Sequence, residues 1–180
     1  MTKSANAPLM SDAQFTLMSK AYDSRPPVIQ QLQRQLANSI VLYLNFKLCG
    51  WKAEQYGSFT LQAEFSRLAG NMKSVYDGLD ERIQLIAEDS DVALESLVED
   101  ATVRQVSRET AFESMLAVAN ANAMLVVRET RQAVAELSRD DHDDPASAEL
   151  LSAVLKVYEA QAWYLRELIA PETDCPLVSN

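Results

Sequence analysis

The sequence contains a single histidine, His142, among its 180 residues, and it has no Glu-x-x-His motif. Helical bundles that bind two metal ions commonly take their ligands from glutamates and from such motifs on facing helices. A metal site of that type therefore cannot be assembled within one copy of this chain. A Gly-rich phosphate loop, a Cys-x-x-Cys pair and a Ser/His/Asp set are also absent, so the usual signatures of nucleotide binding, dithiol redox chemistry and serine hydrolysis are missing.

Glycine and proline are scarce as well. Only four glycines occur, and no proline lies between Pro27 and Pro145. The intervening sequence is rich in Ala, Leu, Glu, Gln and Arg, which favour helix, and it lacks the residue that most effectively breaks one. The scarcity of these residues predicts an all-α protein.

Positive charge is limited, and the formal net charge is −10. Nucleic-acid binding draws on Lys and Arg, and the first 25 residues offer only Lys3, Lys20 and Arg25. We therefore do not expect DNA binding. An acidic surface of this kind either is simply solvated or attracts cations.

The two cysteines, Cys49 and Cys175, lie far apart, and no secretory signal is recognisable. We expect free thiols in a reducing compartment, and hence a cytoplasmic protein. The most apolar window, residues 116–127, is interrupted by Asn120 and Asn122 and is too short to span a bilayer. No membrane association is expected.

Apolar residues recur at steps of three and four, which is the period of an amphipathic helix. We predict four long helices and one short one, over residues 28–54, 59–88, 92–99, 108–138 and 146–170. The short helix lies in a crossover that runs the length of the bundle, as in a ferritin-like four-helix bundle. The bundle is expected over residues 26–170, between an N-terminal tail (1–25) and a C-terminal tail (171–180).

Helix starts are indicated by capping residues. Ser58 is a candidate N-cap, Thr110 and Glu113 have the spacing of a capping box, and Asp144 precedes Pro145 at the start of the last helix. The apolar stripe predicted for that last helix is Leu150, Val154, Val157, Gln161, Tyr164 and Leu168.

Asp77 and Glu81 form the best candidate pair of metal ligands. They lie four residues apart on one face of the second helix, with Ser66 upstream on nearly the same line. Two such carboxylates hold a divalent cation when waters or a second copy complete the shell. The alternative is a solvated or interface face, on which these acids pair with Lys73 or Arg82.

The acidic loop Asp140–Asp144 has two interpretations. It attracts cations, or it is a polar loop that caps the following helix. His142, within it, is interpreted as a solvated loop residue. Trp51 and Trp163 are interpreted as core or interface residues rather than as a cofactor site.

The stretch LYLNFKLCGWKAEQYGSFTLQAEF, residues 42–65, resembles the signature of the Dps family. In that family a His-Trp pair leads through a turn to Phe, then to Leu-His, then to an acid, and Trp51, Phe59 and Leu61 stand at matching places. The segment DGLDER, residues 77–82, resembles the family's Asp-x-x-Ala-Glu-Arg segment, and the acidic loop and last helix also fit. The resemblance spans about residues 28–170.

The resemblance implies a ferroxidase site shared between two-fold-related subunits. Gly50 and Gln62 stand at the family's two histidine positions, and Ser66 stands at one of its acidic positions. Asp77 and Glu81 match two further acids. Gly offers no side-chain ligand, the Gln amide is weak and Ser is uncharged, so the affinity for Fe(II) should fall.

The resemblance further implies a hollow dodecamer, in which Asp143, Asp144 and Glu149 form a cation entrance. We therefore expect a Dps-like iron-storage and stress-protection shell with a weakened or altered ferroxidase centre. Iron is the expected metal, other divalent ions remain open, and any enzymatic activity would be Fe(II) oxidation. The alternative is a non-catalytic shell or interaction subunit that co-assembles with an active paralogue.

Overall fold

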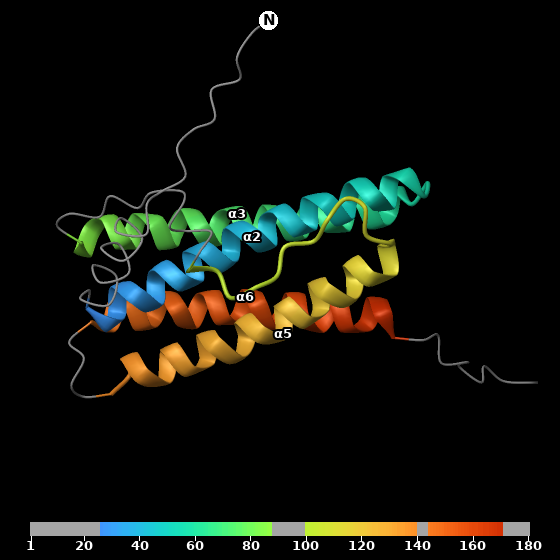
Figure 1. Ribbon diagram of the computed structural model, residues 1–180. Coiled ribbons are helices and arrows are strands. Elements are labelled where there is room, and N and C mark those ends of the chain that lie inside the picture. The colour runs from blue at the N-terminus through green and yellow to red at the C-terminus, as the bar shows by residue number, and fades with distance from the viewer. Residues whose placement is uncertain (1–25, 88–99, 140–143, 171–180) are drawn as a thin grey trace, which may run out of the picture.

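The computed structural model describes residues 26–87, 100–139 and 144–170, and within them four long helices form and no strand does. These helices are α2 (Pro27–Gln55), α3 (Phe59–Ile86), α5 (Phe112–Leu137) and α6 (Pro145–Ile169). Figure 1 shows them lying lengthwise beside one another in a single bundle. The predicted all-α four-helix bundle is confirmed, whereas the short helix predicted over 92–99 lies outside the described residues.

The helices form two pairs. A tight turn at Gly57 connects α2 to α3, and its φ of 77° is a conformation that glycine adopts without strain. The second pair is α5 with α6, and α2 also packs on α5. In Figure 1 the α2/α3 pair lies above the α5/α6 pair. No helix of the described part is both long enough and apolar enough to cross a bilayer.

The core fills the space between the pairs with aliphatic and aromatic side chains. Its largest fully buried members come from all four helices: Leu32, Leu42, Phe46, Phe65, Leu68, Met72, Leu79, Ile83, Met115, Leu151, Tyr158 and Leu165. Burial of such side chains contributes about 2 kcal/mol each, before the loss of conformational entropy is subtracted. In α3, apolar side chains at the three- and four-residue steps of an amphipathic helix are buried from Phe65 to Ile83.

The described part of the crossover, residues 100–111, runs along the α2 and α5 side of the bundle (Figure 1). Side-chain amides hold it in place. Asn45 donates to the carbonyl of Arg104 (2.8 Å) and accepts from the amide of Val106 (2.9 Å). Asn122 bonds both the amide and the carbonyl of Arg104, at 2.9 and 2.7 Å. Because the helices satisfy these backbone groups, the segment stays extended without a neighbouring strand.

This anchoring delays the start of α5. The sequence predicted a helix from Arg108, but α5 begins at Phe112. The predicted capping box of Thr110 and Glu113 is wrong, because Ala111 occupies the N-cap position and no side chain caps it. Ser58 does occupy the N-cap position of α3, although its hydroxyl makes no capping hydrogen bond.

The buried stripe of α6 differs from the prediction by one residue at most positions. The buried positions are Ser147, Leu151, Val154, Tyr158, Gln161, Ala162 and Leu165, while Leu150, Val157, Tyr164 and Leu168 are only half-buried. The cause is an apolar arc wider than one stripe, so that periodicity alone did not fix which edge faces the core.

Candidate functional site

The structure brings Gly50, Gln62 and Ser66 together where α2 and α3 meet near their connecting turn. A Cβ added to Gly50 would lie 3.4 Å from Cβ of Phe65 and 3.6 Å from the carbonyl oxygen of Gln62. The Gln62 amide donates to the Ser66 hydroxyl at 3.2 Å. Gly50 therefore has no side chain that could bind a metal ion, and the side chains of Gln62 and Ser66 are hydrogen-bonded to each other.

Asp77 and Glu81 lie further along α3 and are exposed. Asp77 accepts a hydrogen bond from the ammonium of Lys73 at 2.6 Å, which is the pairing that the alternative interpretation of this face predicted. Both side chains of that pair are more than half exposed, so it contributes little to stability. Glu81 forms no ion pair within the described part of the chain.

Gln62 and Ser66 cannot meet Asp77 and Glu81 within one chain. Ser66 and Asp77 are eleven positions apart in one straight helix, which is about 16 Å at 1.5 Å per residue. No group of three His, Cys, Asp or Glu side chains suited to a metal ion occurs among residues 26–87, 100–139 and 144–170. The described residues of one chain therefore do not fit a di-iron site, and a second copy would be needed to bring Asp77 and Glu81 near Gln62.

Two basic side chains lie beside Trp51, the residue that follows Gly50. The sequence did not predict this feature. Lys47 Nζ lies 5.8 Å and Arg108 Cζ lies 5.5 Å from the centre of the Trp51 ring, as expected for cation–π contacts. Trp51 itself is 46% exposed, so it is not a core residue. Arg108 arrives from the crossover, more than fifty residues away, which is why no local pattern revealed it.

A cavity of about 650 Å³ opens between α2 and the crossover at this place. Its lining contains two cations and no carboxylate: Tyr43, Leu44, Lys47, Leu48, Trp51, Gln105, Val106, Ser107 and Arg108. Neither Lys47 nor Arg108 pairs with an acid of the described chain. The lining of this cavity is therefore positively charged, which opposes the approach of Fe(II) from this side.

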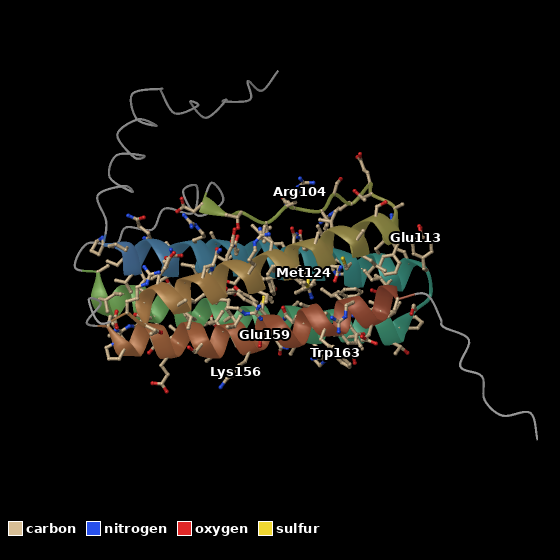
Figure 2. All side chains as sticks on the ribbon, turned by 90° about the horizontal axis from the view of Figure 1, so that it is seen from below. Arg104, Glu113, Met124, Lys156, Glu159 and Trp163 are labelled. Atoms are coloured by element: carbon tan, nitrogen blue, oxygen red, sulfur yellow. The ribbon has the colours of Figure 1, made fainter. Side chains whose placement is uncertain are left out.

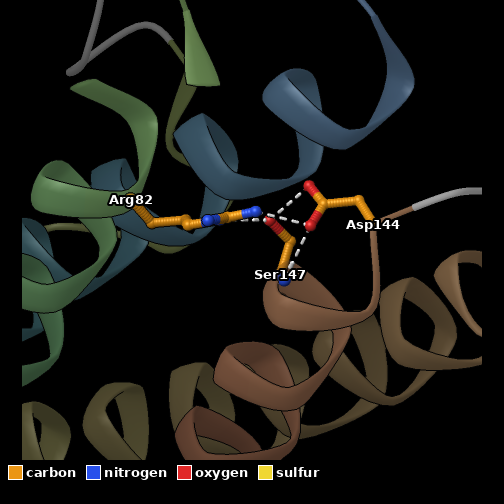
Figure 3. A network of polar contacts seen from close by, with 3 residues as sticks. All are labelled: Arg82, Asp144 and Ser147. Carbon is orange, nitrogen blue, oxygen red and sulfur yellow. Dashed lines mark hydrogen bonds and ion pairs between the residues drawn. The ribbon is translucent and has the colours of Figure 1, made fainter. Parts of the chain in front are cut away.

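Asp144, predicted as part of a cation entrance, has a structural role at the start of α6 (Figure 3). Its carboxylate accepts from the amide of Ser147 (3.1 Å), from the Ser147 hydroxyl (2.7 Å) and from Nη2 of Arg82 (2.6 Å). Burial alone would raise the pKa of Asp144, but the hydrogen bonds from Ser147 and the Arg82 guanidinium outweigh it and lower that pKa. The predicted N-cap is confirmed, and Arg82 ties α3 to the cap.

The remaining candidates are dispersed. Glu149 is exposed on the first turns of α6, while Asp143 and His142 lie outside the described residues. Trp163 is 58% exposed and points away from the bundle axis (Figure 2), so the core alternative is wrong for it too. Cys49 is fully buried, and burial raises the pKa of its thiol to about 12, which leaves it unreactive.

A few polar side chains are buried in the middle of the bundle, where the described residues form no metal site. Thr130 donates to Gln35 at 2.8 Å, and Gln161 donates to the carbonyl of Leu68 at 3.2 Å. Tyr158 is fully buried, and burial raises the pKa of its phenol. Neutral amides and hydroxyls are weak metal ligands, so this cluster specifies helix register instead.

Comparisons with known proteins agree with the fold. The family model described as a ferritin-like domain matches residues 29–172. A DNA protection during starvation protein of Brevibacillus brevis is 30% identical over 139 residues, which cover 77% of this chain and 91% of the relative.

Solved structures of the same kind superpose on the bundle. Dps from Thermosynechococcus elongatus has a TM-score of 0.74 at 23% identity, covering 93% of this chain and all of that one. An archaeal Dps homologue from Halobacterium salinarum has a TM-score of 0.73 at 24% identity, covering 84% and 82% of the two chains. At these identities the likeness establishes the fold.

The fold and the matched domain make this chain a ferritin-like protein. More narrowly, the extent and identity of the match to the Brevibacillus relative show that it belongs to the Dps family.

Proposed function

We propose that this chain forms a Dps-like iron-storage and oxidative-stress-protection shell whose ferroxidase centre is weakened or altered. The observation that carries the proposal is the trio of Gly50, Gln62 and Ser66, which lie together at the α2/α3 contact without a charged or imidazole ligand. Asp77 and Glu81 are the metal-binding acids that remain. Iron is the substrate that such a shell stores, and a catalytic role is limited to residual Fe(II) oxidation.

Iron oxidation tests this proposal directly. Metal-free protein is mixed with Fe(II) and with peroxide or oxygen, and the rise of ferric absorbance is followed. We expect a slow but protein-dependent rate, which falls to that of buffer in Asp77→Ala/Glu81→Ala. The matched control is Glu109→Ala/Glu113→Ala, which removes two exposed carboxylates with the same spacing near the start of α5. If wild type equals buffer, catalysis at this site is rejected.

Restoring ligands provides the complementary experiment. The triple variant Gly50→His/Gln62→His/Ser66→Asp returns two imidazoles and one carboxylate to the α2/α3 contact, where the added Cβ at position 50 meets its neighbours at ordinary distances. Since removing such ligands or their supports typically costs about 10- to 100-fold, a comparable gain in initial rate is expected. An unchanged rate would show that these three positions are not what limits oxidation.

A second candidate is a non-catalytic shell or interaction subunit that co-assembles with an active paralogue. The same trio favours it, because a paralogue's imidazoles would complete sites that this chain leaves incomplete. Native mass spectrometry after co-expression decides between the two: mixed shells support co-assembly, and exclusively homomeric shells reject it. In either case the proposed assembly is a dodecamer.

We propose that the acidic surface near the start of α6 draws cations toward the shell, with Glu149 as its described and exposed carboxylate. Asp144 contributes less, because both of its oxygens already accept hydrogen bonds. Direct DNA binding is not proposed, since the net charge of −10 opposes it. Retention of DNA by this protein in a low-salt gel-shift assay, with divalent ions chelated, would contradict that view.

A further inference from the structure

The polar face of α3 is symmetric about the middle of the helix. It comprises Gln62, Ser66, Gly70, Lys73, Asp77 and Glu81, spaced by four, four, three, four and four residues. The position numbers 62 and 81, 66 and 77, and 70 and 73 each add up to 143. Two antiparallel copies of α3 with a two-fold axis at positions 71–72 therefore place Gln62 opposite the partner's Glu81, and Ser66 opposite the partner's Asp77.

Gly70, beside that axis, has no packing partner for a side chain among the described residues of one chain. It is exposed in the middle of a regular helix, and an added Cβ would meet nothing within 4 Å. Glycine in a helix interior lowers helix stability relative to alanine, so an exposed glycine here is unfavourable for an isolated chain. A second helix that crosses at this point would explain the glycine, because the lack of a side chain allows the two helix backbones to approach closely.

Unpaired charges of opposite sign lie near the two ends of the face. Near Gln62 and Gly50 lie Lys47 and Arg108, which form no ion pair with any carboxylate of the described residues. At the other end, within the same described part of the chain, Asp77 pairs only with the exposed Lys73, and Glu81 forms no ion pair. The two-fold operation brings the basic end of one copy to the acidic end of the other, twice per pair.

Lys47 belongs to the same surface as this face of α3. The ring of Tyr43 on α2 packs edge to face against that of Tyr76 on α3, with centroids 6.1 Å apart. Lys73 lies over the Tyr76 ring at 5.5 Å. Lys47 follows Tyr43 by one helical turn, on the way to Gly50. Trp51 and Leu44, 46% and 43% exposed, add apolar area to the contact.

The geometry points to an inter-subunit site in which protein cations compete with a metal ion for the two remaining acids: Asp77 and Glu81 of one copy meet the ammonium of Lys47 and the guanidinium of Arg108 of the other, across an α3–α3 contact centred on Gly70. This inference rests on the proposed shell and specifies one of its interfaces. The partner copy contributes half of each site, which a single chain leaves incomplete. Pairing through this face needs no metal, and it weakens with salt because the charges are partly exposed.

A charge-reversal cycle tests the ion pairs. Lys47→Glu and Glu81→Lys are each expected to weaken association about 10-fold or more, and the double variant is expected to recover most of that loss. Sedimentation velocity in low salt with a chelator measures the assembled fraction. Arg128→Glu is the control, since Arg128 is exposed on α5 and forms no ion pair within the described residues. Additive losses in the double variant, without recovery, would overturn the pairing.

Gly70→Leu tests the helix contact independently. The isolated chain has open space at this position, so helical content should be unchanged by circular dichroism, while the assembled fraction falls. Ala135→Leu, a small exposed residue on α5, serves as the matched control. An assembled fraction unaffected by Gly70→Leu would overturn the contact.

Metal addition separates failure of this inference from failure of the shell. Wild-type protein that assembles in chelator supports the inference. If the protein assembles only after Fe(II) or Zn(II) is added, the proposed shell is retained and the proposed site of Lys47 and Arg108 is rejected. Protein that stays monomeric under both conditions overturns the shell together with its interface. Assembly in chelator that none of these variants changes leaves the shell standing and places its contacts elsewhere.

Discussion

Asp144 combines a role that its sequence neighbours predicted with one that they did not. Its position before Pro145 predicted the N-cap of α6, which the structure confirms, whereas its hydrogen bond from Arg82 joins it to a residue 62 positions earlier in the chain. The ion pair is about four-fifths buried, at 23% and 20% exposure of the two side chains. A partly buried, charge-assisted network of this kind stabilises the fold more than a surface pair does.

The pH dependence of stability should reveal this role. The folded pKa of Asp144 lies below its unfolded value, so its stabilisation is fully present above the unfolded value of about 4 and is lost as the pH falls through the folded pKa. Asp144→Asn retains a capping side chain but does not titrate. We expect the free energy of unfolding of wild type to exceed that of the variant by about 1–2 kcal/mol at pH 6, and by less at pH 3.

Urea unfolding followed by circular dichroism, at fixed protein concentration, provides this comparison. Glu159→Gln is the control, since its ion pair with Arg131 is exposed and should change stability by less than about 0.5 kcal/mol. A difference between wild type and Asp144→Asn that stays constant from pH 6 to pH 3 would contradict the account.

Among the helices, α6 is the one that sequence periodicity placed least accurately. Its apolar residues cover more than one stripe, so two registers that differ by one residue were both compatible with the pattern. The structure selects Leu151, Tyr158 and Leu165 for the core. The polar Gln161 belongs to both registers and is fixed by its hydrogen bond to the Leu68 carbonyl.

Two neighbouring leucines distinguish these registers. Leu151→Ala removes a fully buried side chain and should lower the free energy of unfolding by about 3 kcal/mol, within the usual range of 2–5. Leu150→Ala, at a half-buried position beside Gly78, should cost about 1 kcal/mol. Thermal or urea unfolding of both variants at equal concentration gives the ranking. Equal costs, or the reverse order, would restore the predicted stripe.

At the scale of the whole molecule, the crossover connects the two helix pairs and also brings Arg108 to the candidate site. Its extended course depends on Asn45 and Asn122, which satisfy the backbone groups of Arg104 and Val106. The position of Arg108 beside Trp51 is thus a consequence of buried amides on α2 and α5.

Removing one of these amides should loosen the crossover without unfolding the bundle. Asn45→Leu leaves the buried amide of Val106 without an acceptor, which costs about 1–3 kcal/mol. Hydrogen exchange at Val106 should accelerate, while exchange in the middle of α3 stays slow. Gln132→Leu, an exposed amide on α5, is the control. Unchanged protection at Val106 would show that the crossover is held by other contacts.

The sequence by itself determined the all-α bundle, because apolar periodicity and the lack of proline act locally along each helix. It also showed that Gly50, Gln62 and Ser66 stand at the positions where the resemblance to the Dps family predicts two histidines and an acid. Tertiary structure decided three further features: which edge of α6 is buried, that Asp144 forms an ion pair with Arg82, and that Lys47 and Arg108 contact the Trp51 ring. These contacts join residues far apart in the chain, and their free energies depend on distances and burial that no local pattern encodes.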